Sequence, residues 1–197
     1  MLMLFVAFLS FPLGIGAAVY LEEYAANTAF TRLVNTVVRN LAGVPSIVYG
    51  LLGLAVFVVA LGDIVGPGPA SGRSLIAGGL TMAILVLPIV IITSAEALRA
   101  VPAAIREAAF GVGATRWEVV RSHVLPYAAP GIFTGTILSM ARAFGETAPL
   151  ILVGAVIGGF NVRYESVLEQ LQGRYTALPT TVYDWARKPP DFQGNVY

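Results

Sequence analysis

Two residues of opposite charge, Arg142 and Glu146, lie within long uncharged stretches of the chain. Because they are four residues apart, they share one face of a helix and can form an ion pair. Thr136 and Ser139 precede Arg142 by six and three residues, which places all four side chains in one stripe. A guanidinium binds two oxygens of an oxyanion at once, and hydroxyls can donate to further oxygens. The stripe is therefore a candidate anion path, unless the pair is a structural one that locks two helices.

The composition indicates a membrane protein. Charged residues form 12% of the 197 residues and hydrophobic residues 57%, whereas soluble proteins carry about 25% charged residues. The near balance of 12 basic and 11 acidic residues argues against nucleic acid as a partner. With no cysteine and one histidine, the chain lacks the residues for a disulfide framework, a thiolate metal site or a histidine metal site.

Charges are absent from three long windows, and each window can cross a hydrocarbon core of about 30 Å as a helix. A fourth segment contains Arg142 and Glu146, and a single helix over all of it would be too long for one crossing. A charge inside the membrane is costly, so both side chains should face the bundle or a water-filled path. We expect an all-α, polytopic membrane helix bundle with four spans, at about residues 1–21, 41–62, 74–95 and 130–155.

Basic residues predict the orientation, because cytoplasmic loops are enriched in arginine. Six arginines fall in the loops after the first and third spans, and on the opposite side three lie close to a span: Arg73, Arg163 and Arg174. The Arg-rich loops should therefore be cytoplasmic, and the C-terminal loop, residues 160–197, extracytoplasmic. The first span lacks the basic start of a signal peptide, so we interpret it as retained.

The cytoplasmic loop at residues 101–126 has the pattern of two short helices joined by a turn. Ile105, Ala109 and Val112 share one face of the first helix, and Gly113 suits the turn. Trp117 begins a second apolar stripe that continues through Val120 and Val124. Such a loop can dock in the groove of a partner, or it can lie on the membrane surface.

This loop resembles the EAA loop of bacterial ABC-importer permeases. The matching residues are Glu107-Ala108-Ala109, Gly113 after three more residues, and Leu125-Pro126. His123 departs from the family pattern, which has an apolar residue there. The resemblance implies that the loop docks into a separate cytoplasmic ATPase, through Ile105, Glu107, Ala108, Ala109, Gly113, Leu125 and Pro126.

Further segments resemble the PstA-type permeases of phosphate-specific ABC importers: Tyr20–Tyr24, residues 40–54 and 87–91, Gly145-Glu-Thr-Ala-Pro149, and residues 176–185. The resemblance implies inorganic phosphate as cargo and a multi-pass position in the plasma (inner) membrane of a bacterium or archaeon, in contact with its lipid. The implied partners are a PstC-type second permease, two copies of the ATPase and an external phosphate-binding protein. Permeases of this family have six spans, so we expect a single permease domain over 1–197 that is incomplete at both ends.

No catalytic or metal-binding residue is expected in this chain. The P-loop pattern is missing and the one lysine precedes a proline, so ATP and Mg would be bound by the partner ATPase and no cofactor by this chain. An intramembrane enzyme would need Glu146 and His123 in one cavity, although about 35 Å of helix would separate them. Two further interpretations stay open: a permease for sulfate or molybdate, and a structural membrane adaptor that transports nothing.

Overall fold

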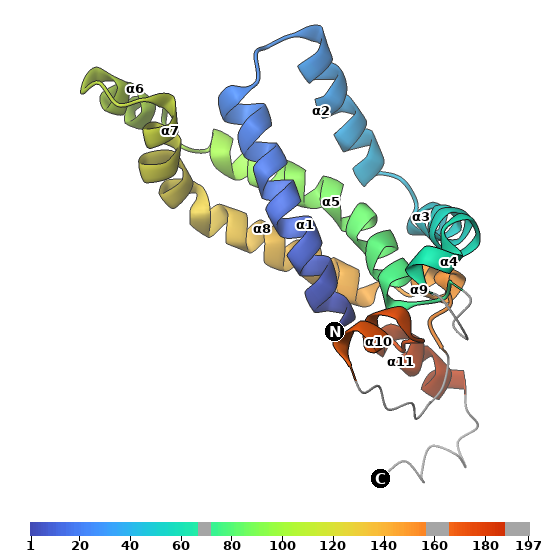
Figure 1. Ribbon diagram of the computed structural model, residues 1–197. Coiled ribbons are helices and arrows are strands. Elements are labelled where there is room, and N and C mark those ends of the chain that lie inside the picture. Colours follow the sequence, from blue (N-terminus) through green and yellow to red (C-terminus); the bar gives the residue numbers. More distant parts are fainter. Residues whose placement is uncertain (67–71, 157–165, 188–197) are drawn as a thin grey trace. The chain divides into compact units, whose positions relative to one another are not determined.

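The computed structural model describes residues 1–66, 72–156 and 166–187, traced in Figure 1. The regular elements in these ranges are all helical, which confirms the expected all-α class. Of the C-terminal loop expected at 160–197, the parts before 166 and after 187 lie outside the described residues. The chain forms two compact units: unit 1 comprises residues 1–6, 44–85 and 142–197, and unit 2 comprises residues 7–43 and 86–141.

Three helices in the described ranges are long and apolar enough to cross a membrane. The first is α1 (Leu2–Val19), which continues as the π-helical segment η1 (Tyr20–Tyr24). The second is α5 (Leu75–Arg99), and the third covers Arg116–Gly145. These helices establish the polytopic membrane bundle that the uncharged windows predict.

The window expected to cross at 41–62 is not one helix. The amphipathic α2 (Ala29–Ala42) ends inside it, and α3 (Ser46–Gly53) begins a second helix that continues as the π-helical η2 (Leu54–Ala60). Pro45 has no N–H to donate and disfavours a helical backbone at the residue before it. The apolar helix therefore begins at Ser46 and not at residue 41. Counted with α2, it makes a fourth candidate span.

The helix Arg116–Gly145 has three parts: α7 (Arg116–Val119), the π-helical η4 (Val120–Val124) and α8 (Leu125–Gly145). In η4, the N–H of Leu125 bonds to the carbonyl of Val120, five residues back. The residue that follows Leu125 is a proline, which cannot donate to a carbonyl of the preceding turn. The wider π turn thus lies directly before the first proline of α8.

The region expected to cross at 130–155 is not one helix. Helix α8 starts before that range and ends at Gly145, and a separate short helix, α9 (Ala148–Val153), follows. Pro149 interrupts the helix because it lacks the N–H that would bond to the carbonyl of Gly145. Glu146 therefore lies in the break between two helices.

Unit 2 has a core of small and branched side chains. The core residues come from α1, α5, α8, α7, η4 and α6 (Ala103–Gly111). A Cβ at Gly14 of α1 would collide with Val90 of α5, and one at Gly135 of α8 would collide with Thr93 of α5. Small residues at such points let membrane helices approach closely. The buried residues of this core are Ala18, Ala95, Leu98, Val101, Ala109, Val119, Val124, Ala128 and Ile132.

Unit 1 packs α3 against α9. A Cβ at Gly50 would lie 2.7 Å from the Cα of Pro149, so the two helix backbones touch there. A Cβ at Gly53 would collide with the side chain of Thr81 of α5, so α3 also packs closely there. The unit also contains α4 (Gly62–Val65), α10 (Val167–Gln172) and α11 (Leu178–Arg187).

Tyr175, which precedes α11, is buried against Gly78 of α5, where an added Cβ would collide with its phenol. Burial raises the pKa of this phenol, whose oxygen has no hydrogen-bond partner within the described part of the chain. Tyrosine is a residue type that is enriched at the membrane–water interface, yet this one anchors the aromatic C-terminal region to a long helix.

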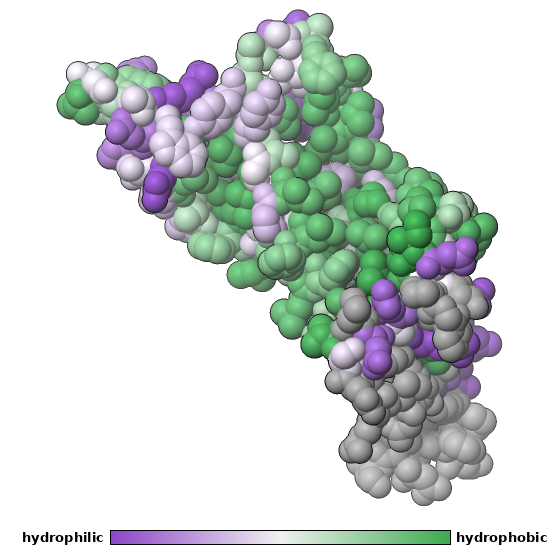
Figure 2. All heavy atoms as spheres, in the orientation of Figure 1, coloured by the Kyte–Doolittle hydropathy of each residue, from purple (hydrophilic) through white to green (hydrophobic). Residues whose placement is uncertain are grey.

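Apolar side chains cover the outside of the long helices. In Figure 2 the hydrophobic residues form most of the visible face of α1 and α8, and hydrophilic residues gather around α6 and α7. Phe8 of α1 and Ile137 of α8 are among the large apolar side chains that are exposed. A surface of this kind is stable only where lipid replaces water around it.

Candidate functional site

The loop at residues 101–126 has the predicted form of a helix, a glycine turn and a second helix. Helix α6 follows Pro102, and Gly113 has φ of +85°, a left-handed conformation that glycine adopts without strain. Thr115 and Glu118 then form a capping box at the start of α7: Thr115 N donates to Glu118 Oε2 at 2.7 Å, and Glu118 N donates to Thr115 Oγ1 at 3.4 Å. The turn and the second helix are thus set by local chemistry.

The residues of the EAA pattern divide between the core and the surface. Ala109 is buried and Ile105 packs against the same core, so these two anchor α6 to unit 2. Glu107, Ala108 and Gly113 are exposed. At the far end of the loop Leu125 is half-buried and Pro126 exposed, and both line an apolar hollow of about 330 Å³ with Ile15, Arg121, Ala129, Ile132 and Phe133.

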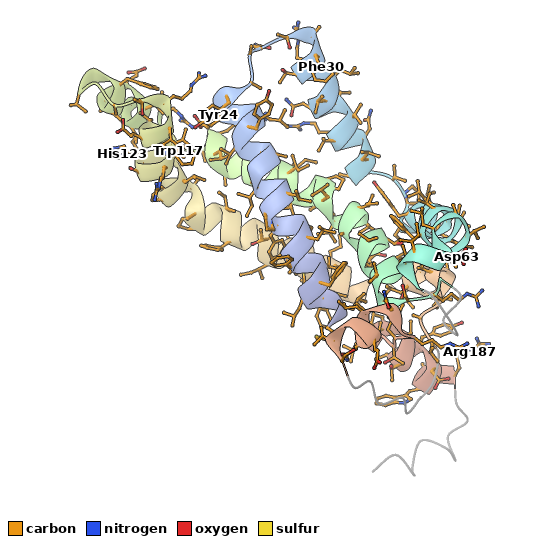
Figure 3. All side chains as sticks on the ribbon, viewed as in Figure 1. Tyr24, Phe30, Asp63, Trp117, His123 and Arg187 are labelled. Atoms are coloured by element: carbon orange, nitrogen blue, oxygen red, sulfur yellow. The ribbon has the colours of Figure 1, made fainter. Side chains whose placement is uncertain are left out.

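Three large apolar side chains of this loop are exposed. Val112 is 86% exposed and Trp117 58% exposed, although helical spacing groups each of them with residues that are buried. Val112 follows the end of α6, where the backbone leaves the helix, so the spacing that groups it with Ile105 and Ala109 no longer holds. Phe110 is also exposed, whereas Val120 and Val124 are buried. Figure 3 shows Trp117 and His123, both exposed, on the α7–η4 segment.

Two ion pairs hold the end of the first long helix, one to the last residue of α5 and one to this loop. Glu22 of η1 accepts from Arg99 Nε at 2.8 Å and from Arg99 Nη2 at 2.5 Å. Glu23 accepts from Arg106 Nη2 of α6 at 2.7 Å. In the sequence analysis Glu22 and Glu23 enter only within the Tyr20–Tyr24 segment of the family resemblance. Two acidic residues directly after an uncharged window are nevertheless a signal that could have indicated ion pairs at this helix end.

Arg142 and Glu146 form the expected ion pair in unit 1, at 3.7 Å between Arg142 Nε and Glu146 Oε1. The Arg142 side chain is 51% exposed and that of Glu146 is 18% exposed. Glu146 is held after the end of α8 by a bond from its N–H to the carbonyl of Ala143 at 3.3 Å. The pair is too long for a direct hydrogen bond, so the guanidinium keeps donors for another partner.

The two hydroxyls of the predicted stripe lie on α8 in unit 2, and both are buried. Thr136 Oγ1 donates to the carbonyl of Phe133 at 2.8 Å, and Ser139 Oγ donates to that of Gly135 at 2.8 Å. Their hydrogens are therefore engaged by the helix itself in this conformation. Arg142, which belongs to unit 1, is exposed, whereas the two hydroxyls are buried within unit 2.

Comparison with known proteins places the chain among transport permeases. The family model of the binding-protein-dependent transport system inner membrane component matches residues 10–183. The chain is 38% identical over 160 residues to the probable ABC transporter permease protein YqgH of Bacillus subtilis (strain 168), which covers 81% of this chain and 50% of that protein. It is 35% identical over 183 residues to the phosphate transport system permease protein PstA 1 of Mycobacterium tuberculosis (strain CDC 1551 / Oshkosh), covering 93% and 55%.

The phosphate transport system permease protein PstC of Mesorhizobium japonicum (strain LMG 29417 / CECT 9101 / MAFF 303099) is 35% identical over 159 residues, covering 72% of this chain and 48% of that protein. The chain spans about half the length of the curated relatives it matches. The family match extends from the first long helix into α11, and so includes both the loop at 101–126 and the Arg142–Glu146 pair. The chain belongs to the family of binding-protein-dependent transport system inner membrane components.

Proposed function

We propose that the chain is a transmembrane permease subunit of an ATP-driven phosphate importer and forms half of its translocation path. The observation that supports phosphate as the cargo is the 35% identity to PstA 1 over 93% of this chain. A guanidinium that keeps free donors in a membrane segment fits an oxyanion cargo. The partners in this proposal are a PstC-type second permease, two ATPase subunits that hold ATP and Mg, and an external phosphate-binding protein.

The loop at 101–126 is the docking element in this proposal. Helix α6 is anchored on one side by Ala109 and Ile105, and on the opposite side it offers Glu107 and Ala108 to a partner. The left-handed turn at Gly113 follows directly, without a side chain to block close approach. A short helix that presents small residues suits the helix-in-groove mode of recognition.

The path residues in this proposal are Arg142, Glu146, Ser139 and Thr136. Arg142 attracts the anion, while Glu146 limits how tightly it is held, so that phosphate passes on. Because both hydroxyls donate to their own helix, they are available to phosphate only in a conformation in which α8 releases them. Alternation between two such conformations is what transport requires.

Uptake measurements test the proposed cargo. Membrane vesicles that contain the permease, its second permease subunit and the ATPase should accumulate radiolabelled phosphate when supplied with ATP and binding protein. A tenfold excess of unlabelled phosphate should suppress the signal, and the same excess of sulfate or molybdate should leave it unchanged. Suppression by sulfate or molybdate would assign the cargo to another oxyanion, and ATPase binding with no anion uptake would favour a structural adaptor.

Replacing Gly113 by alanine should weaken co-purification of the ATPase with the permease. An L-residue in the left-handed conformation costs about 1–2 kcal/mol, so the turn after α6 should relax and move the docking helix. Gly111→Ala is the matched control, because an added Cβ also meets open space there and the residue lies inside a helix. Equal recovery of ATPase with both variants would show that the turn does not position the docking surface.

A further inference from the structure

The acidic doublet Glu22-Glu23 is unusually shielded for residues at the end of an exposed helix. Their side chains are 14% and 10% exposed, respectively. Carboxylates are rarely buried this far unless they are paired. Each is paired with a different arginine, and the two arginines come from two different elements of unit 2.

Glu22 holds the last residue of α5. Arg99 reaches it with two donors, Nε at 2.8 Å and Nη2 at 2.5 Å, one to each carboxylate oxygen. A two-point contact of this kind fixes orientation as well as distance. The ends of α1 and α5 that adjoin the docking loop are thereby fixed to each other.

Glu23 holds the docking helix itself. Arg106 of α6 donates from Nη2 to Glu23 at 2.7 Å and to the carbonyl of Leu98 at 2.9 Å, and from Nη1 to the carbonyl of Val101 at 2.7 Å. One guanidinium therefore joins α6 to η1 and to the end of α5. Arg106 directly precedes Glu107, the first residue of the EAA pattern, so this connection lies at the docking surface.

A third contact repeats the arrangement on the second helix of the loop. The guanidinium of Arg116, the first residue of α7, lies over the ring of Tyr24 at 5.8 Å from the ring centre, a cation–π distance. Tyr24 closes η1, directly after the two acids (Figure 3). Beneath these polar contacts, Ala18 of α1 shares the apolar core with Leu98, Ala109 and Val119.

The charged groups surround a cavity of about 400 Å³ lined by Glu22, Glu23, Arg99, Arg106, Phe110 and Arg116. Two of the three guanidiniums are paired with the two carboxylates, and the third lies over the ring of Tyr24. The charged groups of this cluster therefore bind partners from neighbouring helices.

Building on the proposed function, we propose that Glu22 and Glu23 are positioning residues that transmit the movement of the docked loop to α1. The ATPase moves α6, and α6 pulls η1 through Arg106 and Glu23. The Arg99–Glu22 pair makes the end of α5 move together with η1. Without these contacts the loop would still dock and the ATPase would still turn over, but α1 would no longer follow.

A charge exchange at the first pair tests this. In the reconstituted permease–ATPase complex, E22R and R99E should each lower the phosphate transported per ATP hydrolysed by at least about fivefold, the lower end of typical coupling effects. The double variant E22R/R99E should recover most of the ratio, because the same two side chains can pair in reverse. Arg39→Glu on the exposed polar face of α2 is the control and should leave the ratio unchanged.

A second measurement is independent of the cargo. The chain has no cysteine, so spin labels can be placed at two exposed sites, Leu13→Cys on α1 and Ala104→Cys on α6. In the complex, ATP should leave the distance between the labels unchanged, and in E22R it should change that distance. If wild-type vesicles took up no phosphate while the labels behaved as described, the proposal that phosphate is the cargo would be wrong. The proposal that Glu22 and Glu23 link α6 to α1 would still be supported. A change of distance in the wild type, or single variants that lose transport and hydrolysis in equal proportion, would overturn the proposal.

Discussion

Replacing Arg142 by glutamine is expected to abolish measurable phosphate uptake while the permease still inserts into the membrane and binds its ATPase. Glutamine keeps an amide NH2 group but loses the positive charge and the bidentate contact that a guanidinium makes with an oxyanion. Charge-assisted hydrogen bonds contribute about 1.5–3 kcal/mol each. Because 1.4 kcal/mol corresponds to a factor of about ten, losing about 2.8 kcal/mol of anion binding at this step should slow uptake by about 100-fold.

The measurement is ATP-dependent uptake of radiolabelled phosphate, normalised to the amount of ATPase that co-purifies with the permease. Arg187→Gln is the matched control, because Arg187 is an exposed arginine of unit 1 that contacts its own helix neighbour Tyr183. Uptake by Arg142→Gln at the wild-type rate would remove Arg142 from the path and leave the ion pair with Glu146 as a structural feature.

Replacing Gly50 by valine should prevent α3 and α9 from packing, with loss of both stability and transport. A Cβ at this position would lie 2.7 Å from the Cα of Pro149, a backbone atom that cannot rotate away, and 2.8 Å from Leu152 Cδ1. Overpacking by even small groups costs about 1–3 kcal/mol, and the two extra methyls of valine add to that cost. Displacing α9 would also displace Glu146, which lies two residues before it.

Thermal unfolding of the purified permease in detergent, followed by uptake in vesicles, measures this effect. Gly50→Ala should fall between the wild type and Gly50→Val. Gly16→Ala is the control, because no atom lies within 4 Å of a Cβ added there. Wild-type stability of Gly50→Val would mean that α3 and α9 do not make this contact in the membrane.

The sequence predicted the long helices well because their signal is local. Stretches without charge that exceed the thickness of the hydrocarbon core have one stable solution in lipid, a helix, and α1 and α5 match the predicted windows. The turn at Gly113 was predictable for the same reason, since a left-handed residue and a capping box are encoded by adjacent residues.

The helix ends were harder to predict where one proline decides them. The windows at 41–62 and 130–155 are apolar throughout or nearly so, and hydropathy does not register that Pro45 and Pro149 each remove a backbone donor. The helix boundaries at Ser46 and Gly145 follow from that single missing hydrogen bond. Apolar content indicates how much chain enters the membrane, and backbone hydrogen bonding determines where the helix stops.

The contacts of Glu22 and Glu23 could not be predicted because their partners are distant in the sequence. Arg99 is 77 residues from Glu22, and Arg106 is 83 residues from Glu23. Neither spacing nor composition relates an acid to one particular arginine over such distances. Val112 and Trp117 are exposed although helical spacing groups them with buried residues, because Val112 lies beyond the end of α6 and Trp117 lies in the first turn of α7.

The π turn of η4 sets the rotation of the side chains of α8 relative to those of α7. Each residue of an α-helix turns the chain by about 100°, and a π turn holds one residue more than an α turn. The buried residues Val120, Val124, Ala128, Ile132 and Thr136 recur every four residues, a longer repeat than the 3.6 of a regular α-helix. Deleting one residue from η4 would leave a continuous helix but turn every side chain of α8 beyond it, Ser139 included, by about 100° relative to α7.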